Sequence, residues 1–499
     1  MEEKEENKGK LFYLFLFLNA FLWTLLESFR NIVGNDALEA ISWGELISFG
    51  TNKHPPMSGW LAGGMYNLFG QSDIAIYFLG QICILAGFIY LYKLAKFFLT
   101  EEKAMCSTLV LSSCYYFTYV AFYENFNCNF LSMALWPMIA YYYYKSVKED
   151  RLLDWVLFGV VSAFGVLTKY QVIFLYLALF VHLILCERRQ FKKKGMYAAI
   201  GVGSLVILPH VIWLFQHDFF SFVYMAERAD VGANNTPKFL IKYGRIVFPI
   251  KFYLDQLLSV ASCIGLYLLL AWQSKNIKFL KSEGEKSEKI FLLSVGLLPI
   301  LMQGGIAIIS NSRIQGMWGS MMVSFAGLLL FYFFPVEFNK NTFKFCLKLA
   351  YVFMAGWLIA MAIFLQCQAK LHISFPYQTI LPEFDKKWAE KTNNAKLKYV
   401  GGDINYAFKF RVYGKNHPRV ILETFGYKNP WINHEDVLKS GAIILTRNEE
   451  DVARNVRDLI TMLPEKYQIT YDKYEFKIKS KYKKTKEFKF YYTIIPPMD

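Results

Sequence analysis

The stretch GNDALEAISWGELISFGTNKHPPMSGW, residues 34–60, gives the first indication of the fold. It carries the carboxylates Asp36, Glu39 and Glu45 and then the turn Lys53-His54-Pro55-Pro56, and long apolar runs lie on both sides of it. Ionisable side chains so close to a bilayer are costly and by default mark a functional site rather than a connector. The sequence therefore predicts a membrane protein with a functional loop between its first two spans.

The composition of the whole chain agrees with this prediction. Of 499 residues, 55% are hydrophobic and 19% are charged, and the mean hydropathy is +0.25; soluble proteins average roughly 45–50% apolar and about 25% charged residues. Much of the net charge of +15 lies in short loops between apolar runs, which favours membrane topology over nucleic-acid binding. The eight cysteines show no metal-ligand spacing and no disulfide framework, so we expect buried thiols.

Eleven apolar segments are candidates for membrane spans, which need roughly 20 residues each. The first follows a charged N-terminus and is expected to be an uncleaved span. The predicted spans are 11–29, 74–98, 104–122, 128–145, 152–168, 171–187, 196–215, 252–273, 289–310, 316–334 and 345–366.

The distribution of Lys and Arg predicts the orientation. Loops on one side are rich in basic residues, as in 188–194, whereas the opposite loops contain few. Since basic loops stay in the cytoplasm, the N-terminus is expected there. The loop 30–73 and the chain beyond about Ser374 are expected outside.

The last part of the chain differs in character from the rest. Short β-type runs at 398–400, 419–422 and 442–445 alternate with helical patterns such as 449–463, which predicts a small α/β domain. A tail at 467–495 mixes Lys with Tyr and Phe and is expected to form edge strands or a hairpin, with lysines protecting the edge. We therefore expect a transmembrane domain at 1–373 and a soluble α/β domain at 374–499.

Asp36 and Glu39 follow the first span directly and allow two interpretations. Asn35 or Asp36 could be the N-cap of a short amphipathic helix, with Glu39 as the capping-box partner. A carboxylate at a dry membrane edge can also keep a raised pKa and act as a base. The two roles are compatible.

Further polar clusters fall on the same predicted side, which favours one outward-facing site. Lys53 and His54 could supply positive charge or an imidazole ligand, or could simply shape the turn. Lys169 could bind a phosphate, or could extend towards the interface as lysines at span ends commonly do. The other candidates, each with a structural alternative such as a solvated loop or a helix cap, are Glu124, Asn127, Asn129, Tyr170, His217, Asp218, Arg228 and Arg313.

Taken in order, these motifs resemble one family, the bacterial membrane glycosyltransferases of the protein O-mannosyltransferase and aminoarabinose-transferase type, which have the GT-C fold. The matching elements are Asp36 with Glu39, Lys53-His54-Pro55-Pro56, Asn127-x-Asn129, Lys169-Tyr170, Pro209-His210 through Gln216-His217-Asp218, Arg313–Gly319, Gly402-Asp403 and Pro430-Trp431. Related enzymes often carry adjacent Asp and Glu in the first loop, whereas Ala37 follows Asp36 here.

The resemblance implies a mainly α-helical bundle of about eleven spans in a bacterial inner membrane. It implies transfer of a sugar from a polyprenyl-phosphate donor to a lipid acceptor such as lipid A, or to a glycan. Asp36 would be the base and Lys169 the phosphate ligand, with Arg228 and Arg313 as further candidates. Some relatives bind a divalent metal, for which His54 and Glu39 are the available ligands.

Two other functions remain open at this point. A protein acceptor is the first alternative. A flippase or transporter of polyprenyl-linked sugars is the second, but transporters place ionisable residues near the middle of the membrane and often show repeated halves. Here the polar clusters lie at one face and no repeat is apparent, which favours the enzyme.

Overall fold

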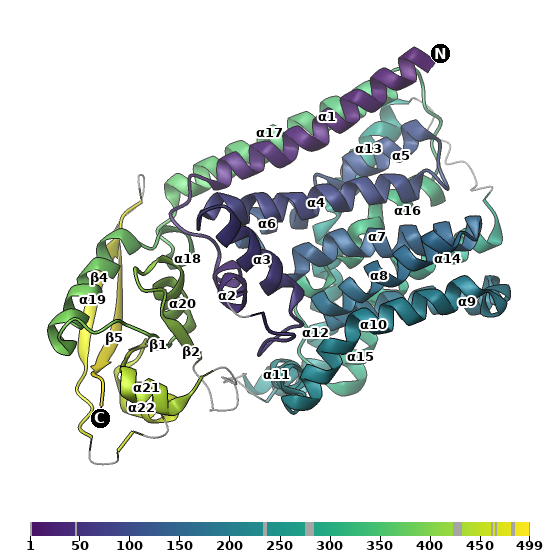
Figure 1. Ribbon diagram of the computed structural model, residues 1–499. Helices are drawn as coiled ribbons and strands as arrows, with labels where there is room; N and C mark the ends of the chain where they lie inside the picture. Colours follow the sequence, from purple (N-terminus) through teal and green to yellow (C-terminus); the bar gives the residue numbers. More distant parts are fainter. Residues whose placement is uncertain are drawn as a thin grey trace. The chain divides into compact units, whose positions relative to one another are not determined.

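The fold is mainly α-helical, and the sheet found among the described residues lies in the C-terminal part of the chain (Figure 1). The structure is a computed structural model that describes residues 2–44, 47–232, 237–274, 284–422, 432–460, 463–464, 467–480 and 485–498. The chain divides into two compact units. The helical unit comprises Met1–Glu27, Phe49–Ser58 and Tyr77–Met361, and the mixed unit comprises Ser28–Ser48, Gly59–Ile76 and Ala362–Asp499.

In the described part of the chain, four helices are long and apolar enough to cross a membrane, and three bent helix pairs qualify if each pair is one span. The four are α1 (Glu2–Glu27), α4 (Asp73–Ala95), α10 (Lys194–Gln216) and α17 (Thr342–Cys367). The pairs are α5 (Glu101–Leu111) with the segment Tyr115–Glu124 that ends in α6 (Tyr119–Glu124), bent by 74°; α12 (Lys238–Ser259) with α13 (Ala261–Gln273), bent by 42°; and α14 (Lys286–Gly296) with α15 (Leu298–Ser310), bent by 45°.

The remaining predicted spans also fall on helices. These are the largely buried α7 (Cys128–Glu149) and the shorter apolar helices α8 (Leu152–Thr168), α9 (Ile173–Cys186) and α16 (Ala326–Phe333). Each of the eleven predicted segments thus coincides with helical structure, and the predicted fold class is confirmed. The count of eleven crossings stays a prediction.

The outer surface of the helical unit is apolar where a lipid-facing surface is expected. Side chains such as Leu205 and Phe215 on α10 and Val352 and Ile359 on α17 are exposed. The helices α1 and α17 run side by side (Figure 1), with the rings of Phe15 and Tyr351 edge to face at 5.0 Å between centroids. Helices satisfy their own backbone hydrogen bonds, so they can present such apolar surfaces to a bilayer. All eight cysteines are free thiols, and six of them are buried as expected, whereas Cys186 and Cys367 are partly exposed.

The mixed unit contains a five-stranded sheet in the order β2-β1-β3-β5-β4. Strand β1 pairs in parallel with β2 and β3, and β5 pairs antiparallel with β3 and β4. The tail thus forms the expected hairpin, but of its two strands only β4 lies at an edge of the sheet, because β5 pairs with both β3 and β4. The strands are β1 (Tyr399–Gly402), β2 (Arg419–Leu422), β3 (Ala442–Thr446), β4 (Asp472–Ile478) and β5 (Lys486–Ile495).

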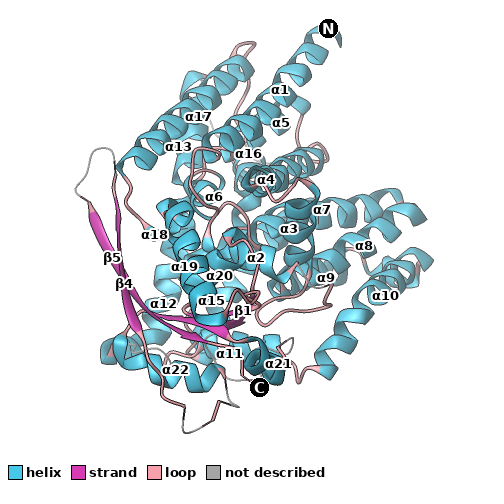
Figure 2. Cartoon of the chain, turned by 60° about the vertical axis from the view of Figure 1, so that its left-hand side comes forward, coloured by secondary structure: helices cyan, strands magenta, loops and turns pink. Residues whose placement is uncertain are grey.

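Helices cover both faces of this sheet (Figure 2). On one face, Phe384 packs edge to face against Phe410 and Tyr492. On the other, Ile444 and Val456 belong to a buried apolar core. The first face carries α19 (Tyr377–Thr392) and α20 (Ile404–Tyr413), and the second carries α21 (His434–Ser440) and α22 (Val452–Leu459), which is preceded by a short 3₁₀ turn at Glu449–Asp451.

The mixed unit is larger than the predicted C-terminal domain, because most of the loop between the first two spans belongs to it. This loop forms α2 (Asn35–Trp43) and α3 (Met57–Leu68). A Cβ atom added to Gly44 would lie 2.5 Å from the Cα of Gly63. The two helices therefore approach closely at a point where a side chain would not fit, and α2 also packs on α20.

Candidate functional site

In the helical unit, residues Thr51–His54 form a turn that the Thr51 side chain holds together. Thr51 Oγ1 accepts hydrogen bonds from the backbone N–H groups of Lys53 at 3.2 Å and His54 at 3.0 Å. The same hydroxyl donates to the carbonyl oxygen of His54 at 2.8 Å. Such side-chain bonds replace a regular ladder and fix the local backbone. The conformation of Lys53 and His54 therefore depends on Thr51.

This turn packs against α11 (Phe220–Ala229), the helix that follows α10. Ser221 Oγ donates to the carbonyl oxygen of Thr51 at 2.9 Å. The Lys53 ammonium lies 5.6 Å from the centroid of the Tyr224 ring, and the His54 ring lies edge to face against the same ring at 6.4 Å. A cation over an aromatic face is attracted to it. Helix α11 thus orients both side chains that the sequence singled out.

His210 connects the same loop to two further helices. Its Nδ1 lies 2.5 Å from the carbonyl oxygen of Phe49, and its Nε2 lies 2.9 Å from Tyr170 Oη. Because a carbonyl oxygen can only accept, Nδ1 carries the proton and Nε2 accepts from the Tyr170 hydroxyl. A Cβ atom at Gly50 would lie 2.2 Å from the Trp213 ring, so only glycine fits this position of the loop.

Lys169 ends α8 and is buried, with 8% of its surface exposed. Its ammonium donates to Asn129 Oδ1 at 2.5 Å. Asn127 is the N-cap of α7, and its Oδ1 accepts from the backbone N–H of Asn129 at 2.8 Å. Asn127 therefore positions Asn129, which in turn positions Lys169. An ammonium has three N–H donors, so the bond to Asn129 does not by itself exhaust its capacity.

The electrostatic environment of this cluster is cationic. Burial, together with the neighbouring ammonium groups of Lys169 and Lys53, lowers the pKa of His54 from 6.5 to about 3. His54 is therefore neutral at physiological pH, and the two lysines give the cluster its charge. Such an arrangement suits an anion, because charge-assisted hydrogen bonds to phosphate are among the strongest in proteins.

A divalent metal fits this environment poorly. The two ammonium groups that disfavour protonation of His54 also disfavour a metal cation at its ring. Within the described ranges, no group of three or more His, Cys, Asp or Glu side chains is arranged to hold a metal ion. The suggested metal at His54 and Glu39 stays a prediction, and the reaction proposed below uses no metal.

The structure also brings the two candidate arginine segments together. The backbone N–H of Arg313 donates to the carbonyl oxygen of Ala229 at 2.8 Å, and Asp230 and Ser312 form an antiparallel bridge. Arg228, at the end of α11, directly precedes Ala229 and is exposed. Helix α11 thus packs against the Lys53 turn near its start and lies beside the Arg313 segment at its end.

His217, Asp218 and Glu124 lie at the ends of helices, and the contacts of His217 are with its own helix. His217 Nδ1 lies 2.8 Å from the carbonyl oxygen of Trp213, and the two rings stack at 4.3 Å. Asp218 is exposed with a φ of 49°, two residues after the end of α10. Glu124 ends α6, before the Asn127 cap. Substrate binding by these residues stays a prediction.

Asp36 and Glu39 lie on α2 in the mixed unit. The predicted cap is wrong: Gly34 occupies the N-cap position with no side-chain cap, and the helix begins at Asn35. Glu39 is therefore too far along the helix to be a capping-box partner. Asp36 is exposed in the first turn, whereas Glu39 is buried. Glu45, expected to face water, lies outside the described residues.

A buried polar network holds the start of α2. The Asn35 side-chain amide donates to Asn405 Oδ1 at 2.7 Å and lies 2.7 Å from His372 Nδ1. Lys409, which is fully buried, donates to Asn35 Oδ1 at 3.1 Å. Asp403 caps α20 by accepting from the backbone N–H of Asn405 at 2.7 Å. The residue next to Asp36 is thus fixed by side chains from the C-terminal part of the chain.

The network contains charged side chains that are buried, and burial shifts the pKa of one of them strongly. Burial lowers the pKa of Lys409 from 10.5 to about 7, while Asp403 opposes the shift and Arg447 adds to it. Arg447 forms an ion pair with Asp403, which is buried. A buried charge is costly unless it is paired and hydrogen-bonded. The network therefore contains one ion pair and one lysine that titrates near neutral pH.

Sequence reasoning missed several residues of these clusters. Thr51, Ser221, Tyr224, His372 and Lys409 were not singled out, and Asn35 was considered only as a cap. One signal was present for Lys409, since a lysine between Phe408 and Phe410 on a largely apolar helix is unusual. The others act through contacts between distant segments, which no local pattern shows. Pro430 and Trp431 lie outside the described residues.

Comparison with known proteins gives one family match and a set of similar folds. Residues 53–213 match the family described as dolichyl-phosphate-mannose-protein mannosyltransferase. This segment includes Lys53, His54, Asn129, Lys169 and His210. A search of curated protein sequences finds no match.

Among solved structures, ArnT from Cupriavidus metallidurans bound to undecaprenyl phosphate has a TM-score of 0.51 at 11% identity. The alignment covers 96% of this chain and 97% of that one. The apo oligosaccharyltransferase of Archaeoglobus fulgidus gives a TM-score of 0.49 at 11% identity, over 94% of this chain and 73% of that chain. At such identities the likeness to ArnT shows a shared fold.

Proposed function

We propose that this chain, a membrane glycosyltransferase of the GT-C type related to the protein mannosyltransferases and ArnT, moves a sugar from a polyprenyl-phosphate donor to a lipid or glycan acceptor. The acceptor class we favour is a lipopolysaccharide-like lipid such as lipid A. The protein would act on the outer face of a bacterial inner membrane, with its N-terminus in the cytoplasm.

The observation that carries the proposal is the cationic cluster of the helical unit. Lys169 is buried and held by Asn129, and Lys53 is held over the Tyr224 ring. His54, which both ammonium groups influence, is neutral. A polyprenyl phosphate that leaves a sugar departs with negative charge. Fixed cations near a leaving group stabilise the charge that develops in the transition state. The undecaprenyl phosphate bound to ArnT, which has the same fold, supports this donor class.

The proposed reaction needs one base and one leaving group. Asp36 takes the proton from an acceptor hydroxyl, and the acceptor oxygen forms a bond to the anomeric carbon. The bond between that carbon and the phosphate oxygen breaks, and its electron pair leaves with the polyprenyl phosphate. The anomeric centre passes through an oxocarbenium-like state, as in other glycosyl transfers. Lys169 and Lys53 bind the phosphate throughout.

The exposure of Asp36 supports its role as the base, since a carboxylate must reach the substrate hydroxyl. The hydrogen bonds of Asn35, the preceding residue, support it as well, because they fix the start of the helix. Preorganised groups accelerate a reaction more than mobile ones.

The test compares three strains: a deletion strain carrying the wild-type gene, Asp36→Asn, or the matched control Asp458→Asn. Asp458 is an exposed aspartate on α22. Mass spectrometry of lipid A, surface glycans and proteins measures the modification. We expect it to be lost with Asp36→Asn and kept with the control, at equal protein levels.

Normal modification with Asp36→Asn would overturn the assigned base. A modification found only on proteins would shift the acceptor class. Donor lipid that accumulates on the inner leaflet of the deletion strain, with transfer intact, would favour a flippase.

A further inference from the structure

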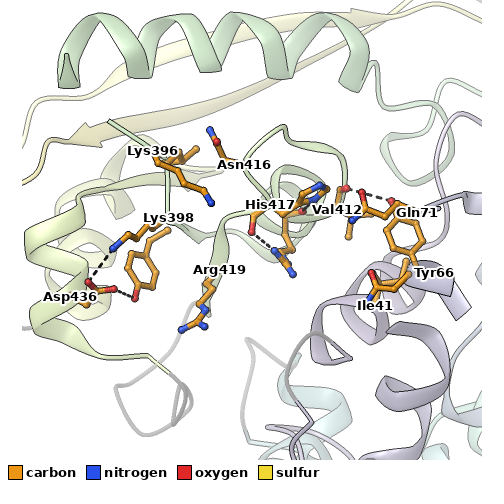
Figure 3. A pocket seen from close by; sticks show the side chains of 14 residues that line it. Ile41, Tyr66, Gln71, Lys396, Lys398, Val412, Asn416, His417, Arg419 and Asp436 are labelled. Atoms are coloured by element: carbon orange, nitrogen blue, oxygen red, sulfur yellow. Dashed lines mark hydrogen bonds and ion pairs between the residues drawn. The ribbon is translucent and has the colours of Figure 1, made fainter. Parts of the chain in front are cut away.

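A cleft of 640 Å³ lies within the mixed unit (Figure 3). Its walls come from two parts of the chain, because α2 and α3 contribute Ile41 and Tyr66 while the C-terminal part contributes most of the polar side chains. Ligand pockets of proteins typically measure about 300–1,000 Å³. The cleft is therefore large enough for a sugar-sized ligand.

The cleft is strongly basic. Lys396, Lys398, Arg411 and Arg419 line it, against the single lining carboxylate Asp436. Asp436 is engaged on its own side, where it pairs with Lys398 at 3.5 Å and accepts from Tyr399 Oη at 2.6 Å.

Two of these cations differ from the rest in their pairing. Lys396 and Arg419 are exposed, and no carboxylate among the described residues lies within ion-pair distance of either. By contrast, Arg411 donates to the carbonyl oxygen of His417, which orients its side chain. Cations that have no carboxylate partner in the described part of the chain are suited to an anion, and arginine and lysine together are the usual ligands of phosphate.

The opposite wall of the cleft combines apolar and aromatic side chains with the polar Gln71. Ile41, Tyr66 and Val412 lie together there (Figure 3), and Tyr66 Oη donates to the carbonyl oxygen of Val412 at 3.5 Å. A cavity with charges on one side and an aromatic ring on the other suits a ligand with a phosphate and a sugar ring. Free phosphate would use only the charged side.

The cleft also shares a helix with the proposed base. Ile41 lies on α2, five positions after Asp36, which is about 7.5 Å along a helix axis. The helix that carries the base therefore also forms part of the cleft wall. A group bound in the cleft would be held by the same unit that holds Asp36.

We propose that this cleft binds a sugar phosphate, and that it holds the phosphorylated headgroup of the acceptor lipid. The second part rests on the proposed function, whereas the binding of a sugar phosphate does not. No group is transferred in the cleft itself, which serves as a specificity site.

The experiment measures binding to the full chain in lipid nanodiscs without any donor, so it does not depend on catalysis. Isothermal titration calorimetry is used with inorganic phosphate and with glucosamine 1-phosphate. Nanodiscs that also contain lipid A, or lipid A from which the phosphates have been removed, are tested by competition with glucosamine 1-phosphate.

Two matched double variants are compared. Lys396→Ala with Arg419→Ala removes two cations of the cleft, and Arg454→Ala with Lys479→Ala removes the same charge from exposed positions of the same unit outside the cleft. We expect the first to weaken glucosamine 1-phosphate binding by about tenfold or more, as for loss of charge-assisted hydrogen bonds, and the second to leave it unchanged. Lys396→Arg with Arg419→Lys should restore binding.

The outcomes distinguish the two possible sources of the bound phosphate, a lipid headgroup and free phosphate. Competition by lipid A but not by its dephosphorylated form supports the acceptor headgroup. Equal binding of inorganic phosphate and glucosamine 1-phosphate, without competition by lipid A, overturns the headgroup part and leaves a site for free phosphate. Unchanged binding in Lys396→Ala with Arg419→Ala overturns the whole inference.

The failure of this inference is distinguishable from failure of the proposed function. Loss of transfer in Asp36→Asn with intact glucosamine 1-phosphate binding leaves the cleft and the base as separate findings. If the double alanine variant unfolds, as judged from its melting temperature, the single Arg419→Gln is measured instead, because this exposed side chain lies at the first position of β2.

Discussion

The side-chain amide of Asn35 donates a hydrogen bond to Asn405 Oδ1 at 2.7 Å, across 370 residues of sequence. Asn35 is the first residue of α2 and directly precedes Asp36, whereas Asn405 lies on α20. The bond means that the position of the proposed base depends on a helix from the other end of the chain. Contacts that support a site residue without touching the substrate commonly decide whether the site is held precisely enough to work.

We therefore predict that Asn405→Ala lowers kcat without raising KM for the donor. The loss of a buried hydrogen bond costs about 1 kcal/mol, which corresponds to a fall of about fivefold if the bond acts only through the position of Asp36. Steady-state kinetics with purified protein would measure it. The control is Asn455→Ala on α22. A KM effect with unchanged kcat would contradict a positioning role.

Lys169 should carry much of the binding of the donor phosphate. We predict that Lys169→Met lowers kcat/KM at least about tenfold, as expected from the loss of a charge-assisted bond, and that Asn129→Leu has a smaller effect in the same direction. Lys192→Met serves as the control, because Lys192 is exposed in the short turn that follows α9. An equal effect of the control and Lys169→Met would show that the loss is one of general stability.

Lys409 predicts a pH dependence of stability above neutrality. Its pKa is about 7 in the folded protein against 10.5 ordinarily, because the side chain is buried. Between these values the unfolded chain binds more protons, so the free energy of unfolding should rise with pH. Lys409→Met should lose this part of the slope. Thermal unfolding at pH 7.0 and 9.5 would measure it, and an unchanged slope in Lys409→Met would contradict the assignment.

The lowered pKa of His54 predicts a pH dependence of stability on the acidic side. Its pKa falls from 6.5 to about 3 on folding, so below pH 6.5 the unfolded chain binds more protons. Stability should therefore be lost as the pH falls from about 6.5 towards 3. His54→Gln cannot be protonated and should lose less stability between pH 7 and pH 4.5. Unfolding followed by fluorescence in detergent tests this, and equal acid sensitivity of both proteins would rule it out.

Gly50 should be required for the loop that carries Lys53 and His54. A Cβ atom there would lie 2.2 Å from the ring of Trp213, whereas a Cβ atom at Gly64 has open space. We predict that Gly50→Ala destabilises the protein by about 1–3 kcal/mol, as overpacking does, and that it weakens donor binding. Gly64→Ala is the control. Equal melting temperatures of the two variants would contradict the close approach.

The sequence predicted the helical regions and the sheet well for physical reasons that are local. Apolar runs such as 74–98 predict spans because their composition alone decides whether they can lie in a bilayer. The strands at 419–422 and 442–445 fall on β2 and β3, since alternating helices and strands with glycines at their ends are visible in one window. The predicted cap at Asn35 or Asp36 was wrong, because the helix begins at Asn35 and the place of its first turn depends on what Asn35 contacts elsewhere.

The sequence by itself determined that this is a helical membrane protein, and it indicated which motifs are candidates for chemistry and which class of enzyme their order resembles. These follow from composition and spacing. Only the tertiary structure decided that Asn129 holds Lys169, that α11 holds Lys53 and His54, that Asn405 and Lys409 hold Asn35, and that a basic cleft forms beside α2. Each of these depends on segments far apart in the chain, and no local pattern records which distant side chain satisfies a buried polar group.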